Sequence, residues 1–108
     1  LGGYEAAQYL NSLPNADRLL IWSDYYGVCE FFRGRCLTLE YEAAAKQRFD
    51  YAVLSSRGKS LYRPEHSRWK KTKNLQMSAA YADPNPDWQL LIDDRERNFV
   101  KVVKMDAE

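Results

Sequence analysis

The sequence predicts an α/β fold: a small sandwich with central parallel strands, flanking helices and a C-terminal antiparallel β-hairpin. Two observations lead to this prediction. First, apolar runs of strand length at 18–22 and 49–54 are separated by segments with helical periodicity, the order typical of parallel strands and their crossovers. Second, WQLLI at 88–92 and NFVKVV at 98–103 flank a short charged loop, which is the pattern of a hairpin.

The amino-terminal segment is predicted to form a helix followed by the first central strand. Its apolar side chains recur at i, i+3, i+4 and i+7, which places them on one helical face. Pro14 ends this helix, because proline disfavours helical geometry in the residue before it. The run from Arg18 to Trp22 then reads as a strand buried on both faces of a sheet. We expect the helix to pack on the sheet through Leu10 and Leu13.

The middle of the chain is predicted to alternate short helices and strands. Residues 25–32 repeat the helical spacing, and Gly34 ends that helix. CLTLEY at 36–41 alternates apolar and polar side chains, as a half-exposed strand does. EAAAKQ at 42–47 supplies a helical link, and FDYAVLSS at 49–56 is the next central strand.

A last helix is predicted from Pro64 to about residue 80, because proline suits the first turn of a helix. Its first part, RPEHSRWKK, gathers cationic side chains around Trp69. These cations could face phosphate groups, or the segment could be a solvated helix face with Trp69 packed inward. We prefer the second interpretation, because Lys and Arg normally keep their charge in water.

The sequence predicts one soluble domain that covers residues 1–108, and the missing initiator Met and secretion signal lead us to expect that it is excised from a longer membrane protein. A chain of 108 residues supports one core. Its 16 Lys and Arg against 15 Asp and Glu give a net charge of +1, which provides no field that would attract nucleic acid. From this charge balance we expect no nucleic-acid partner. No apolar run approaches the roughly 20 residues that a helix needs to cross a bilayer.

The sequence predicts neither a metal site nor a cofactor. His66 is the only histidine, and with Cys29 and Cys36 it provides no spacing for a zinc site. Gly58 begins a Gly-Lys-Ser sequence that matches the end of a phosphate-binding loop. However, Val53 occupies the place of the first glycine in that motif, so nucleotide binding is not predicted.

Ser23 and Asp24 follow the first central strand and have two interpretations. Short polar side chains accept hydrogen bonds from the first amides of a helix, so either residue could cap the helix predicted next. Alternatively, Asp24 at a strand tip could bind a sugar or its phosphate carrier together with Tyr25 and Tyr26. We prefer the cap, because Asp and Ser are among the most favoured capping residues.

Cys29 and Cys36 also leave two alternatives open. Cys29 lies on the apolar face of its predicted helix, where a free thiol serves as a small buried hydrophobe. The two cysteines are separated by only a helix end and a turn, so in an oxidising compartment they could form a disulfide. Sequence separation does not fix the Cα geometry that a disulfide requires.

Three stretches together resemble a known family: GGYEAAQYLNSLPNADRLLIWSDYYGVCEFFRG at 2–34, FDYAVLSS at 49–56 and WQLLIDDRERNFVKVVKM at 88–105. They resemble the soluble carboxyl-terminal domain of polyprenyl-phosphate-dependent membrane glycosyltransferases, the dolichyl-phosphate-mannose protein mannosyltransferase-like and aminoarabinose transferase-like group. Nothing similar is recognised at 57–82. The residues that match the family's helix and strand patterns are Gly3, Glu5, Ala6, Ala7, Tyr9, Leu10 and Asn11, and then Asp50, Tyr51 and Val53.

The resemblance implies an accessory domain on the extracytoplasmic face of a membrane, periplasmic or at the cell surface. Its parent would transfer a sugar from a lipid-linked phosphate donor, and the domain would cover the membrane active site or aid acceptor selection. Its partners would be the transmembrane part of the same chain and the lipid-linked sugar or acceptor. The family's catalytic residues lie in membrane loops outside this sequence, so the resemblance assigns no catalytic residue. The competing interpretation is a freestanding α/β binding or protein-interaction module.

If the domain contacts substrate, two strand tips are the expected place. Parallel neighbouring strands would bring Asp24, Tyr25 and Tyr26 close to Arg57 and Lys59. The cationic side chains would bind phosphate, while the tyrosine faces would stack on a sugar ring.

Overall fold

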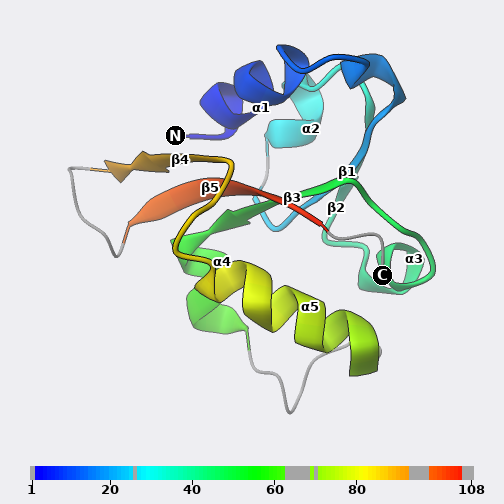
Figure 1. Ribbon diagram of the computed structural model, residues 1–108, viewed down its shortest axis with the longest axis vertical. Helices are drawn as coiled ribbons and strands as arrows, with labels where there is room; N and C mark the ends of the chain where they lie inside the picture. Colours follow the sequence, from blue (N-terminus) through cyan, green and yellow to red (C-terminus); the bar gives the residue numbers. More distant parts are fainter. Residues whose placement is uncertain (1, 26, 63–68, 70, 93–97, 106–108) are drawn as a thin grey trace.

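The computed structural model, which describes residues 2–25, 27–62, 69, 71–92 and 98–105, contains one five-stranded mixed sheet (Figure 1). The strand order is β2-β1-β3-β5-β4. β1 pairs in parallel with β2 and β3, whereas β5 is antiparallel to both β3 and β4. The predicted α/β fold, with central parallel strands and a C-terminal hairpin, is therefore confirmed. The strands are β1 (Leu20–Ser23), β2 (Arg35–Thr38), β3 (Tyr51–Ser55), β4 (Trp88–Leu91) and β5 (Phe99–Lys104).

Helices cover both faces of this sheet. In Figure 1, α1 and α2 lie on one side, and α4 and α5 lie on the other. A short α3 follows β2, and a 3-10 turn precedes β1. No helix in the described part of the chain is long and apolar enough to cross a membrane. The helices are α1 (Gly3–Asn11), α2 (Val28–Phe31), α3 (Tyr41–Ala45), α4 (Ser56–Leu61) and α5 (Lys71–Ala82), and the 3-10 turn is Ala16–Arg18.

The face covered by α1 has a core of small and branched side chains. Leu10 is fully buried there, together with Ile21, Val53 and Val100 of the three central strands. The predicted packing of the first helix through Leu10 is confirmed. Leu13 lies just after the end of α1 and is half-buried against the same cluster.

The face covered by α5 has an aromatic core. Trp22 of β1 lies 5.0 Å from Trp69 between ring centroids and 6.3 Å from Phe49. Trp69 is 6% exposed, so the prediction that it packs inward is confirmed. The helix predicted from Pro64 begins later than expected: Trp69 is not helical, residues 63–68 and 70 lie outside the described part, and α5 runs from Lys71 to Ala82.

Several local elements differ from the prediction. The strand predicted from Arg18 begins at Leu20, because Arg18 belongs to the 3-10 turn. The helix predicted over 25–32 begins only at Val28, since Gly27 before it is left-handed with φ 99°. β2 ends at Thr38 because the next two residues have positive φ. α4 was not predicted, and its start is capped by Ser55, whose Oγ accepts from the Gly58 N–H at 3.1 Å.

Candidate functional site

The carboxylate of Asp24 joins three segments at the carboxyl end of β1. The Asp24 N–H donates to the Val53 carbonyl of β3 at 3.1 Å. Its side chain accepts from the Ser55 N–H, which lies 3.0 Å from Oδ1 and 3.2 Å from Oδ2. The Tyr81 hydroxyl of α5 donates to Oδ2 at 2.6 Å. Asp24 therefore fixes the tips of β1 and β3 and the last turn of α5 to one another.

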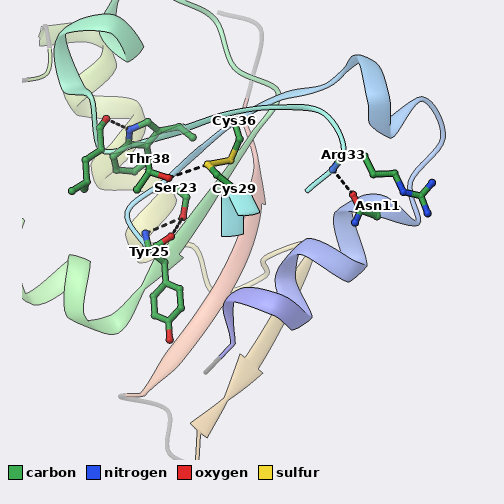
Figure 2. Close-up of a disulfide and its surroundings, with 9 residues drawn as sticks. Asn11, Ser23, Tyr25, Cys29, Arg33, Cys36 and Thr38 are labelled. Atoms are coloured by element: carbon green, nitrogen blue, oxygen red, sulfur yellow. Dashed lines mark hydrogen bonds between the residues drawn. A yellow bond between two sulfur atoms is a disulfide. The ribbon is translucent and has the colours of Figure 1, made fainter. Parts of the chain in front are cut away.

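The prediction that Asp24 or Ser23 caps the next helix is wrong. Gly27 is the N-cap of α2, which has no side-chain cap. Because the helix begins several residues later than predicted, the Asp24 side chain is directed to β3 and α5. Ser23 makes a local turn instead: the Tyr25 N–H donates to Ser23 Oγ, and the Ser23 hydroxyl donates to the Tyr25 carbonyl, both at 2.9 Å (Figure 2).

Gly58 lets the Asp24 carboxylate lie directly against α4. A Cβ atom at position 58 would be 1.7 Å from Asp24 Oδ2, which no real structure tolerates. The sequence singled out Gly58 only as part of an incomplete phosphate-loop motif. Its role here is the close approach of a carboxylate, and no sequence pattern signalled that role.

A pocket of about 500 Å³ opens at these strand tips. It brings together Asp24, Tyr25 and Arg57, three of the five residues expected to contact substrate. Lys59 is exposed on α4 and is not among the described lining residues. Tyr26, the fifth, lies outside the described residues. The other described lining residues are Leu39, Tyr41, Ser55, Gly58, Tyr62, Trp69 and Tyr81.

Burial dominates the electrostatics of the carboxyl group in this pocket. Burial raises the pKa of Asp24 from its ordinary 3.8 to about 6, and the hydrogen bonds from Tyr81 and Ser55 oppose that rise. Burial and the neighbouring Asp24 raise the pKa of the Tyr81 hydroxyl, so this hydroxyl keeps its proton and remains a donor. At neutral pH the pocket therefore holds a carboxylate that is mostly ionised.

The aromatic walls of the pocket are held in place by contacts with one another and with α5. Tyr62 stacks on Tyr81, with ring centroids 5.1 Å apart and an interplanar angle of 29°. The Tyr62 hydroxyl donates to the Asn74 carbonyl at 3.0 Å. Tyr41 meets Trp69 edge to face at 5.3 Å and 78°. These rings come from α3, from the residue after α4, from the segment before α5 and from α5 itself, and no sequence pattern indicated that they converge.

A buried lysine supports the end of α5 that carries Tyr81. Lys101 of β5 is 5% exposed, and its Nζ donates to the carbonyls of Tyr81 at 2.6 Å and Asp83 at 3.0 Å. A cation at a helix carboxyl terminus is favourable because the last carbonyls carry partial negative charge. Burial lowers the pKa of Lys101. Lys101 thus positions Tyr81, and through it Asp24.

The structure contains the Cys29–Cys36 disulfide, one of the two alternatives left open by the sequence (Figure 2). It joins α2 to β2, and the Thr38 hydroxyl donates to Cys29 Sγ at 2.9 Å. Asn11 of α1 adds a second restraint on this segment, because its Oδ1 accepts from the Arg33 N–H at 2.9 Å. Neither cysteine is among the described residues of the pocket.

No group of three or more metal-ligating side chains gathers among the described residues, and His66 lies outside them. Comparison with known proteins adds no identification: no family model, curated protein or solved structure matches this chain. The functional argument therefore depends on the pocket at the strand tips, and the glycosyltransferase resemblance remains a hypothesis.

Proposed function

We propose that this chain is an accessory extracytoplasmic domain of a membrane glycosyltransferase that transfers a sugar from a lipid-linked phosphate donor. In this proposal the pocket at the tips of β1 and β3 holds part of the acceptor or of the lipid-linked sugar. One observation carries it: Asp24, Tyr25 and Arg57, the contacts that the sequence predicts if the domain binds substrate, line the same pocket.

The place and chemistry of the pocket support a ligand. Open α/β sheets bind ligands beyond the carboxyl ends of their parallel strands. The volume of the pocket, about 500 Å³, falls within the range of small-molecule sites. Tyrosine faces pack well against the C–H groups of a sugar ring, Asp24 can accept from hydroxyl groups, and Arg57 can bind phosphate through two hydrogen bonds.

The disulfide supports the proposed location. Disulfides persist in secreted, periplasmic and cell-surface proteins and are rare where glutathione keeps thiols reduced. The Cys29–Cys36 bond therefore agrees with a domain on the outer face of a membrane, next to the transmembrane part of its own chain.

The proposal is tested by calorimetric titration with a short-chain polyprenyl-phosphate sugar analogue. Arg57→Ala and Lys59→Ala form a matched pair, since both remove an exposed cation from α4 but only Arg57 lines the pocket. We expect Arg57→Ala to weaken binding by about tenfold, the usual effect of losing a charged hydrogen bond, and Lys59→Ala to leave it nearly unchanged. Absence of binding by the wild-type chain at millimolar analogue would refute the substrate role.

The hydropathy of the complete reading frame tests the membrane part of the proposal separately. Many membrane spans upstream of residue 1 would support the transferase. An upstream sequence without any spans would favour the freestanding binding module instead.

A further inference from the structure

Aromatic side chains make up half of the described lining of the strand-tip pocket. Two of them, Tyr41 and Trp69, are nearly perpendicular, while Tyr62 and Tyr81 form a stacked pair. Aromatic rings carry negative charge on their faces and positive charge at their edges. The five aromatic lining residues are Tyr25, Tyr41, Tyr62, Trp69 and Tyr81.

Asp24 adds a formal negative charge to this aromatic enclosure. It is the only carboxylate among the described lining residues. Its two oxygens already accept from the Ser55 N–H and the Tyr81 hydroxyl, two donors for the roughly four acceptor positions of a carboxylate. The charge of Asp24 therefore remains in the pocket, and about two acceptor positions remain, fewer than the three N–H donors of a primary ammonium group.

These two properties select for a particular kind of ligand group. A primary ammonium group needs three acceptors, which Asp24 cannot supply. A quaternary ammonium group carries the same charge without N–H donors, and the faces of Trp and Tyr bind it through cation-π attraction. The only cationic side chain among the described lining residues, Arg57, is exposed, so water and salt screen its repulsion.

We infer that the pocket binds a compact quaternary ammonium group, with the Asp24 carboxylate supplying charge and the aromatic rings forming the walls. The inference rests on the proposed function in using the same pocket, and it adds the charge class of the ligand. The Arg57 guanidinium at the start of α4 would suit an anionic group carried next to the ammonium.

Choline and its neutral tert-butyl analogue, in which carbon replaces nitrogen, test this inference directly. The two probes have the same shape and differ in charge, and ethanolamine provides the primary ammonium for comparison. Binding of each probe is measured by isotope-edited NMR. We expect choline to bind about tenfold more tightly than the neutral analogue, and also more tightly than ethanolamine. Equal binding of choline and the neutral analogue would overturn the inference.

Substitutions distinguish the contribution of the Asp24 carboxylate to binding from that of the aromatic rings. Asp24→Asn should weaken choline binding about tenfold and leave the neutral analogue unaffected, whereas Asp17→Asn, an exposed carboxylate outside the described lining, should change neither. If Asp24→Asn does not fold, Tyr41→Leu keeps apolar volume and should still lower the preference for choline. An unchanged preference in a folded variant of either kind would contradict the assignment.

The outcomes also distinguish this inference from the proposed function. Binding of the polyprenyl-phosphate sugar analogue without any preference for choline would overturn the cation site alone. Binding of choline without binding of the sugar analogue would support the cation site and refute the substrate role.

Discussion

Replacement of Asp24 by asparagine should change how stability depends on pH. In the folded chain the pKa of Asp24 is about 6, above its ordinary 3.8, so the folded state binds this proton more tightly than the unfolded state. The contribution of Asp24 to the free energy of unfolding is therefore largest below pH 3.8. It falls as pH rises towards 6 and stays constant above that. A difference of about 2 in pKa, at about 1.4 kcal/mol for each unit, corresponds to a loss of up to about 3 kcal/mol.

Asparagine has the same shape as aspartate but does not ionise, so the Asp24→Asn variant does not lose this stability as pH rises. Its carbonyl can accept from the Ser55 N–H, and its amino group can donate to the Tyr81 hydroxyl oxygen. Urea unfolding of both proteins from about pH 4 to pH 8 gives the difference in unfolding free energy at each pH. We expect the wild type to lose about 2 to 3 kcal/mol relative to Asp24→Asn over this range, with Asp17→Asn controlling for the loss of one carboxylate. A difference that is independent of pH, or that changes in the opposite direction, would refute the reasoning.

Three further substitutions test the packing around the site and in the core. Gly58→Ala should destabilise the chain by at least about 1 kcal/mol in urea unfolding, although alanine favours helices, because its Cβ would overlap Asp24 Oδ2. An equal cost in an Asp24→Ala background would contradict this cause. Leu10→Ala should cost about 2 to 5 kcal/mol in the same assay, since Leu10 is fully buried, and a cost below about half a kcal/mol would show that α1 packs differently. Replacing both Cys29 and Cys36 by serine should cost about 2 to 3 kcal/mol, because the disulfide closes a short loop, and an unchanged melting temperature would argue against the bond.

The arrangement of the sheet was predictable because its signals are local. Continuous apolar runs around Trp22 and Val53 indicated strands buried on both faces, and the structure pairs those strands in parallel. The same logic predicted that Asp24 and Arg57 would meet at adjacent strand tips, and both line the pocket. α4 was missed because the segment from Ser56 has no apolar periodicity, and its start depends on a serine cap.

The function of Asp24 within the fold could not be predicted, because its partners are distant in the sequence. Ser55 is 31 positions away and Tyr81 is 57 positions away. A short polar residue before a helix is most often a cap, and that local preference led to the wrong interpretation. The aromatic walls were missed for the same reason, since Tyr41 and Trp69 become neighbours only when α3 and the segment before α5 pack on the sheet.

The most direct test of the account is NMR mapping of the isotope-labelled chain during titration with the polyprenyl-phosphate sugar analogue. If the pocket at the strand tips holds substrate, the largest chemical-shift changes will gather at Asp24, Tyr25, Ser55 and Arg57 and at the indole of Trp69. Shifts that gather elsewhere, for example around the Cys29–Cys36 disulfide, or no shifts at millimolar analogue, would contradict the central claim that this pocket is the functional site.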